Sequence, residues 1–469
     1  MDAKTSLYTS HRISCHDAFF ETVVTYGLIV DGHLHRLRLK NTLETLVNQW
    51  KILGARISRD LQGNLEYRVP STFNDDIEAF TFDSEILSTP LSDHYQIPLA
   101  PASPSLVTPS PATIFQPPVH LRRSCLSQYE ALFQPILHLQ IVQSSDDEKT
   151  SVGLTLPRCF CDMWGMKEIF SAWSRILENS DDSVPLLIED TTILEKIEWT
   201  SEERPRSLWK HQITGQSQTD ALDVAQEQSE EGATWLFIPV ETLTSSRRVL
   251  ELESEEKIDD MDILFAWWLK ETYVKSVPQA QHAPVAVSVP LNLRGRLDLL
   301  AEGIYHHNAF HMATHVFPSP ASLAENSLAQ LVLTLRRSIL SVDAQEIAHA
   351  LAYKTQNYNA ASGYLNVAHF PPGSENVTFW NMDWLCDGFI DFRPALLDRI
   401  DSSQSFAARR VAGRGRARKG GSHVVPPVKT GSGKVIWAHA LSAGPDNNDM
   451  VVVKRDEHGI WVSFKLMNR

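Results

Sequence analysis

The sequence predicts a mixed α/β protein built from two domains. At 469 residues the chain exceeds the length that one hydrophobic core usually serves. Hydrophobic residues make up 43% of it and charged residues 21%, as in ordinary folded proteins. Strand-like and helix-like segments follow one another without strict alternation, which favours mixed α/β layers over a single parallel sheet.

Hydrophobic periodicity places the elements of the first half. Apolar residues recur at helical spacing in residues 37–57, and residues 63–70 read as a short strand. Residues 101–118 are rich in Pro and Ser, which predicts a surface loop. Apolar and small residues then alternate over 152–156 as in a strand, and residues 166–177 form an amphipathic helical pattern.

The second half repeats the mixture of strands and helices. Residues 234–240 predict a strand and residues 261–273 a helix. A β-branched strand is expected at 284–297, followed by a core-facing helix at 328–339. Residues 450–466 read as two strands joined by a short turn.

Composition shifts suggest where the domains divide. Residues 201–232 are polar and lack a sustained period, so they predict a linker between an N-terminal domain, 1–200, and a C-terminal domain, 233–469. Residues 409–434 are basic and Gly-rich, which predicts a disordered insertion. A basic patch for an acidic partner and a translated intron are the alternatives for this segment.

Charge and cysteine content limit the partners and the compartment. The formal net charge of −14 argues against nucleic acid as the main partner, because its phosphates would be repelled. The five cysteines are odd in number and scattered, which predicts buried thiols in a reducing compartment. No run of about 18 apolar residues occurs, and the N-terminus has no apolar signal segment. We therefore expect a cytoplasmic protein that does not enter a membrane.

The segment 154–170, LTLPRCFCDMWGMKEIF, reads as a strand, a turn and a helix. Arg158 lies in the turn, and Asp162 follows four residues later at the expected start of the helix. An acid at that position caps exposed backbone N–H groups, so Asp162 is expected to be structural.

Five segments in order resemble the BAHD acyltransferases in their fungal form. They are ISCHDAFFETVVTYGLIV (13–30), LKNTLETLVNQWKILGARI (39–57), VGLTLPRCFCDMWGMKEIFSAW (152–173), VAVSVPLNLRGRL with GIYHHNAF (285–310), and WNMDWLCDGFIDFRPALL (380–397). The resemblance implies two similar-sized, chloramphenicol-acetyltransferase-like domains with a channel between them. It also implies acyl-CoA as co-substrate, an alcohol or amine acceptor, no bound cofactor and a monomer.

The family motif H-x-x-x-D-G is altered in this chain. The family His falls on Arg158, and the Gly that follows the motif Asp is displaced to Gly165. The family motif D-F-G-W-G reads DFRPA here, so only Asp391 and Phe392 are kept. By resemblance Asp162 pairs with an arginine of the second domain, Arg294 or Arg296, and Asp391 is structural as well.

An arginine at the position of the base changes the chemistry. Acyl transfer to a hydroxyl requires removal of its proton, and a guanidinium has donors but no acceptor. Losing a general base costs a factor of about 10²–10⁴ in rate, roughly 3–5 kcal/mol of barrier. Arg158 could instead hold an oxyanion, an acceptor carboxylate or a CoA phosphate, or lie along the channel wall and pair with a nearby acid.

The segment YHHNAFHMATH offers substitutes for the missing base. By resemblance His306, His307 and Asn308 lie near the channel, and His307 is the candidate base, although ordinary core or surface histidines fit the pattern better. No ligand spacing for a metal accompanies this cluster. Cys159 or Cys161 as a nucleophile is a further alternative, ranked below buried thiols.

The resemblance implies an acyl-CoA-dependent O-acyltransferase of fungal secondary metabolism. The expected reaction is acetyl transfer to a hydroxyl, impaired or non-standard because Arg158 replaces the base. The alternatives are a cyclase or isomerase that reuses the channel, and a non-catalytic pseudoenzyme.

Overall fold

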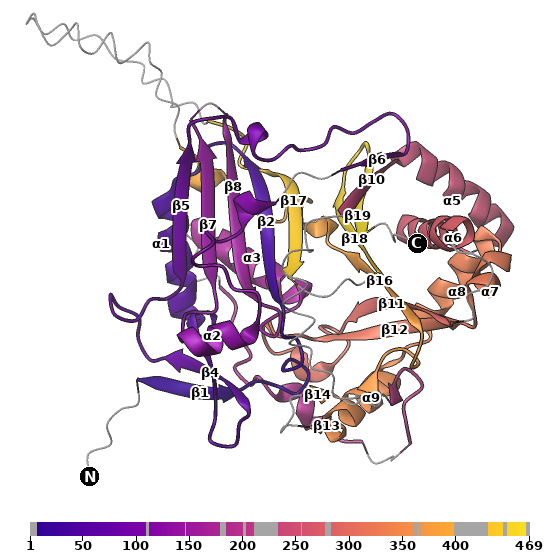
Figure 1. Cartoon of the computed structure of the whole chain (residues 1–469), viewed down its shortest axis with the longest axis horizontal. Coiled ribbons are helices and arrows are strands. Elements are labelled where there is room, and N and C mark those ends of the chain that lie inside the picture. The colour runs from indigo at the N-terminus through magenta and orange to yellow at the C-terminus, as the bar shows by residue number, and fades with distance from the viewer. Residues whose placement is uncertain are drawn as a thin grey trace, which may run out of the picture.

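In the computed structural model, two β-sheets lie side by side with helices against their outer faces (Figure 1). The predicted mixed α/β class is confirmed. The described residues are 7–108, 112–145, 147–178, 184–199, 203–210, 233–254, 256–276, 283–359, 364–365, 367–397, 430–443 and 448–465. Most of the expected linker, 211–232, and most of the basic segment, 409–429, lie outside them.

The first sheet has the strand order β17-β2-β8-β7-β5 within the described residues. Its strands are β2 (Val23–Asp31), β5 (Thr81–Leu87), β7 (His138–Ser144), β8 (Lys149–Pro157) and β17 (Val435–Ala443). Helices α1 (Arg36–Gln49) and α3 (Met163–Leu177) pack against each other and against this sheet. Helix α3 and strand β8 contain the ranges that the sequence predicts. The first helix is shorter than the helical pattern over 37–57, because α1 ends at Gln49 and Arg56–Arg59 form strand β3.

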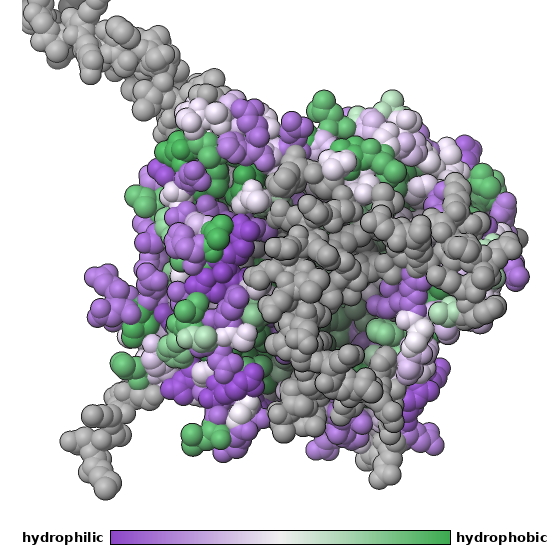
Figure 2. Space-filling view, viewed as in Figure 1, coloured by the Kyte–Doolittle hydropathy of each residue, from purple (hydrophilic) through white to green (hydrophobic). Residues whose placement is uncertain are grey.

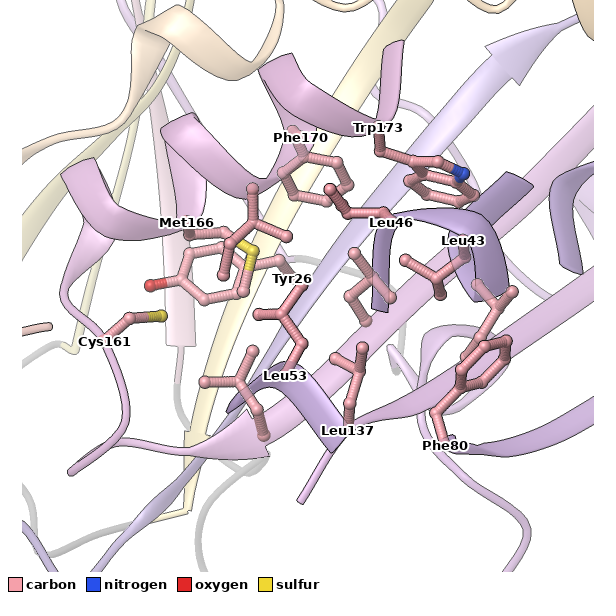
Figure 3. Packing of buried hydrophobic residues seen from close by; sticks show 14 of the residues in the cluster. Tyr26, Leu43, Leu46, Leu53, Phe80, Leu137, Cys161, Met166, Phe170 and Trp173 are labelled. Atoms are coloured by element: carbon pink, nitrogen blue, oxygen red, sulfur yellow. The ribbon is translucent and has the colours of Figure 1, made fainter. Parts of the chain in front are cut away.

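The core of this half lies where the two helices meet the sheet (Figure 3). Leu43 and Leu46 of α1 face Phe170 and Trp173 of α3, and all four side chains are fully buried. The buried positions of α3 follow the helical period, so the amphipathic pattern read from the sequence is the packing face. This packing fixes the turn that precedes α3.

The second sheet has the order β12-β11-β16-β18-β19-β10-β6. Its strands are β6 (Ser105–Val107), β10 (Ala233–Pro239), β11 (Val285–Asn292), β12 (Phe310–Phe317), β16 (Glu375–Asn381), β18 (Asn448–Arg455) and β19 (Gly459–Lys465). The helices on its outer side are α5 (Val240–Ser254), α6 (Asp260–Ser276), α7 (Pro320–Glu325) and α8 (Leu328–Leu340) (Figure 1). The expected terminal hairpin is β18–β19.

Smaller elements complete the described part of the fold, and those that Figure 1 labels lie in its lower part. They are β1 (Tyr8–Arg12), β3 (Arg56–Arg59), β4 (Leu65–Pro70), α2 (Leu126–Leu132), α9 (Ala344–Gln356), β13 (Tyr358–Asn359) and β14 (Tyr364–Leu365), with β9 (Trp209–Lys210) paired to β15 (Val367–Ala368). Strands β1, β4 and β3 form a separate three-stranded sheet.

The two halves of the chain exchange strands. Strand β17, from the C-terminal half, pairs with β2 of the first sheet, and β6, from the N-terminal half, pairs with β10 of the second. Each sheet is therefore completed by the other half of the chain. The predicted boundaries at 200 and 233 stay a prediction.

The surface loop expected at 101–118 is wrong in part. Residues 105–107 form strand β6, and Phe115 is completely buried. A Cβ atom on Gly27 would lie 2.3 Å from the Phe115 ring, and one on Gly153 would lie 1.9 Å from the Phe115 carbonyl oxygen. The two glycines leave a hollow on the sheet that Phe115 fills, which a Pro- and Ser-rich composition does not reveal.

The visible face of the molecule mixes polar and apolar side chains (Figure 2). Among the residues that the structure describes, no helix is both long and apolar enough to cross a membrane.

Candidate active site

The motif turn lies between β8 and α3, as the sequence predicts. Strand β8 ends at Pro157 and α3 begins after Asp162. The Asp162 carboxylate accepts a 2.7 Å hydrogen bond from the Gly165 backbone N–H, so it caps the helix. The displaced Gly165 thus has a local role in the first turn of α3.

The same carboxylate joins the two sheets. Arg294, which follows β11, donates to both oxygens of Asp162 at 3.0 and 3.1 Å, and the Ala309 N–H donates at 2.8 Å. Asp162 is completely buried. Of the two candidate partners, the structure places Arg294 against Asp162, while Arg296 is exposed. Asp162 therefore faces structural donors.

The first turn of α3 packs directly on the backbone of the second half. A Cβ atom on Gly165 would lie 1.8 Å from the His306 carbonyl oxygen, and neither backbone can give way without moving the junction. We expect Gly165→Ala to lower the thermal midpoint strongly, with a cost of about 2 kcal/mol or more. Gly63→Ala is the control, because it adds strain at φ +88° but meets nothing within 4 Å. Equal losses in the two variants would contradict this prediction.

Arg158 lies half-buried at this junction. Its Nη1 donates to Asn308 Oδ1, and to the Cys161 carbonyl oxygen at 3.1 Å. Its guanidinium carbon lies 4.7, 5.6 and 5.9 Å from the ring centroids of three aromatic side chains, Phe20, Phe310 and Trp380 respectively. Among the described residues, Nε and Nη2 have no hydrogen-bond partner, so these N–H groups are left for a ligand.

Asn308 and Asp17 form a chain of hydrogen bonds that leads to Arg158. The Asn308 side chain donates to Asp17 Oδ1 at 2.7 Å and to the Arg158 carbonyl at 3.1 Å, and its backbone N–H also donates to Asp17 Oδ1. Burial raises the pKa of the Asp17 carboxyl well above its usual value, although the Asn308 bonds oppose the shift. This chain of bonds fixes the orientation of the guanidinium.

Sequence reasoning missed Asp17 and the three aromatic residues around Arg158. Asp17 and Phe20 lie in the quoted segment 13–30, but nothing in their spacing links them to a turn more than 130 residues away. Asn308 was predicted near the channel, and the structure places its side chain on Arg158.

His306 and His307 lie in the core beneath the motif turn. Both rings are buried, and His307 Nδ1 bonds to the Phe160 carbonyl at 3.0 Å while its ring stacks on Tyr67. Burial lowers the pKa of His307 to about 3 and that of His306 well below its usual value. Such imidazoles are weak proton acceptors, so the geometry favours packing for both residues.

The two motif cysteines are completely buried. Burial raises the pKa of the Cys159 and Cys161 thiols, and the neighbouring acids raise it further. A thiol with a raised pKa is a poor nucleophile at neutral pH. The geometry therefore favours the buried-thiol interpretation.

Asp391 lies away from Arg158, beside α3. Its N–H donates to Ser174 Oγ at 3.0 Å, and its carboxylate pairs with Arg393, which lowers the pKa of Asp391. Within the described residues, no group of three His, Cys, Asp or Glu side chains could hold a metal ion.

The fold is that of the BAHD-like acyltransferases, which confirms the predicted resemblance. No protein-family model matches the chain. Acetyltransferase adrJ of Penicillium roqueforti is 24% identical, covering 94% of this chain and 88% of that protein. O-acetyltransferase PaAT-2 of Phomopsis amygdali is 22% identical, covering 82% of this chain and 84% of that protein.

A solved structure shows the same architecture. TRI101 of F. sporotrichioides, in complex with coenzyme A and T-2, superposes with a TM-score of 0.64 at 13% identity, covering 97% of this chain and 94% of that one. The predicted two-domain fold is thereby confirmed. The named relatives support the acyltransferase class that the sequence predicts.

Proposed function

We propose that this chain transfers an acetyl or similar acyl group from acyl-CoA to a hydroxyl of a fungal secondary metabolite. The observation that carries the proposal is the intact junction around Arg158, in a chain whose acetyltransferase relative covers 94% of its length. Coenzyme A as co-substrate is supported by its presence in the TRI101 complex. We also propose that the protein is a monomer and is located in the cytoplasm.

Arg158 supplies hydrogen-bond donors in this reaction. As the acceptor hydroxyl attacks the thioester carbonyl, negative charge builds on the carbonyl oxygen, and the Nε and Nη2 groups of Arg158 can stabilise it. The guanidinium cannot remove the hydroxyl proton. Transfer is therefore slower, by a factor of about 10²–10⁴, than with an imidazole at this position.

The test compares the protein with Arg158→His. Release of free CoA from acetyl-CoA is followed with and without a panel of hydroxyl acceptors, and CoA binding is measured separately by calorimetry. We expect measurable but slow transfer by the natural protein and faster transfer by Arg158→His. Arg248→His, at an exposed arginine of α5, is the matched control and should leave the rate unchanged. If both proteins bind CoA and neither acetylates any acceptor, the proposal is wrong.

A second candidate function is a cyclase or isomerase that needs no CoA. One observation favours it: Arg158 is a permanent hydrogen-bond donor and lies among aromatic side chains. Its hydrogen-bonded partner Asn308 carries an amide, which cannot serve as a general base. Conversion of a substrate in the absence of CoA would support this candidate. Binding without conversion would support a pseudoenzyme.

A further inference from the structure

A second group of polar side chains, three of them buried, lies beyond the Arg158 junction, near the end of α9 and the start of β12. It consists of Lys354, His16, His311 and His369, which we call the Lys354 cluster. Phe310 and His311 are neighbours on β12, so their side chains point to opposite faces of the strand. The cluster thus lies across β12 from Arg158, which Phe310 contacts.

Lys354 is buried without a counter-charge. Its residue is 6% exposed, and its ammonium group makes no hydrogen bond or ion pair with any described residue. Burial lowers the pKa of Lys354 to about 8, so the side chain is still mainly charged at pH 7. An unpaired buried charge is costly and is rarely kept without a partner.

The three histidines also have unused ring nitrogens. Both nitrogens of His311 are buried without a partner, as are Nδ1 of His16 and Nδ1 of His369. The His311 and His369 ring centroids are 5.1 Å apart, and His16 Nε2 lies 3.2 Å from Thr355 Oγ1. The Lys354 charge is the second cause, after burial, that lowers the pKa of each of the three rings. All four side chains therefore lie within electrostatic reach of one another.

The chemistry of these groups suits an anion. Neutral imidazoles can each turn an N–H toward a ligand, and the ammonium group adds further donors and one positive charge. A monoanion balances that single charge, whereas a phosphate dianion would leave a buried net negative charge. A planar carboxylate also offers two oxygens, with about four acceptor sites for the donors of the cluster.

We propose that the Lys354 cluster binds a carboxylate group, either on a substrate or as a free small anion. The carboxylate completes the ion pair that Lys354 lacks and accepts hydrogen bonds from His311 and His369. The site is separate from Arg158, and its occupancy does not depend on acyl transfer.

The test uses sodium acetate as the carboxylate probe and acetamide as its neutral counterpart, at constant ionic strength and pH 7. Acetate is expected to raise the thermal midpoint and to bind in a calorimetric titration, while acetamide does neither. Lys354→Met should weaken acetate binding at least tenfold. It should also raise the midpoint of the free protein by a few degrees, because a buried unpaired charge is removed. Lys270→Met is the matched control, since Lys270 on α6 already donates to the Asn326 carbonyl.

His311→Phe provides a second variant in case Lys354→Met does not fold. It keeps a ring of similar size and removes both nitrogens, so acetate binding should again fall. Equal acetate responses in the natural protein and in both variants would overturn the proposal, as would a Lys354→Met protein that is less stable without acetate. Saturating CoA distinguishes the sources: if it displaces acetate from the cluster, the bound group is a CoA phosphate and the carboxylate assignment is wrong.

Discussion

Acidification to between pH 5 and 6 is expected to unfold the protein. Five buried histidines have folded-state pKa values far below 6.5, the value of the unfolded chain. Burial lowers the pKa of His16, His307 and His311 to about 3, and that of His138 and His439 to about 4. Between pH 4 and 6.5 the unfolded chain binds these protons and the folded protein does not. The free energy of unfolding therefore falls as the pH falls.

The loss of unfolding free energy that these histidines cause is large enough to unfold the protein. Each such histidine costs about 1.4 kcal/mol per pH unit below 6.5. Five of them remove roughly 7 kcal/mol at pH 5.5, which is comparable with the whole stability of a typical domain. Asp17, Asp262 and Asp383 act in the opposite direction, because burial raises the pKa of each carboxyl and so favours the folded state on acidification, but they are fewer than the histidines.

Tryptophan fluorescence against pH, together with urea unfolding at several pH values, measures this effect. His439→Gln should reduce the number of protons taken up on unfolding at pH 5.5 by about one. His458→Gln, at an exposed side chain, should leave it unchanged. A protein that stays folded at pH 5 would contradict the prediction.

Asp162→Ala is expected to cost about 3–5 kcal/mol of stability. The substitution removes four acceptor contacts at once: two from Arg294, one from Gly165 and one from Ala309. Arg294 has a side chain that is 13% exposed and would be left as a buried charge without its carboxylate. Thermal unfolding measures the loss directly.

The matched control is Asp391→Ala. Its partner Arg393 is 71% exposed, and exposed ion pairs contribute roughly 0–1 kcal/mol. The double variant Asp162→Ala/Arg294→Ala should be less destabilised than the sum of the two single variants, because neither charge is left alone. Similar losses for Asp162→Ala and Asp391→Ala would show that the bridge does not hold the two sheets together.

The sequence predicted those parts of the site that depend on local order. The strand, turn and helix around Arg158 follow from alternating and helical periods, and Asp162 stands where a helix cap is expected. The choice between Arg294 and Arg296 as the partner of Asp162 came from the resemblance to the family. The sequence could not decide between the two arginines, because they differ only in which side of a turn they face.

Other features depend on contacts between distant segments. The bonds from Asp17 through Asn308 to Arg158 join three parts of the chain, and the Lys354 cluster joins four. The burial of Phe115 follows from a hollow made by Gly27 and Gly153 on neighbouring strands. No local pattern encodes such contacts.

The sequence by itself determined the α/β class, the two core-facing helices of the first half and the presence at position 158 of a guanidinium, which cannot act as a base. Each of these follows from residue type or from a period within one segment. The tertiary structure alone decided which strands complete each sheet, which arginine meets Asp162 and which charges are buried without partners. Strand pairing and burial are set by the free energy of the whole packed chain, to which each segment contributes only one side of every contact.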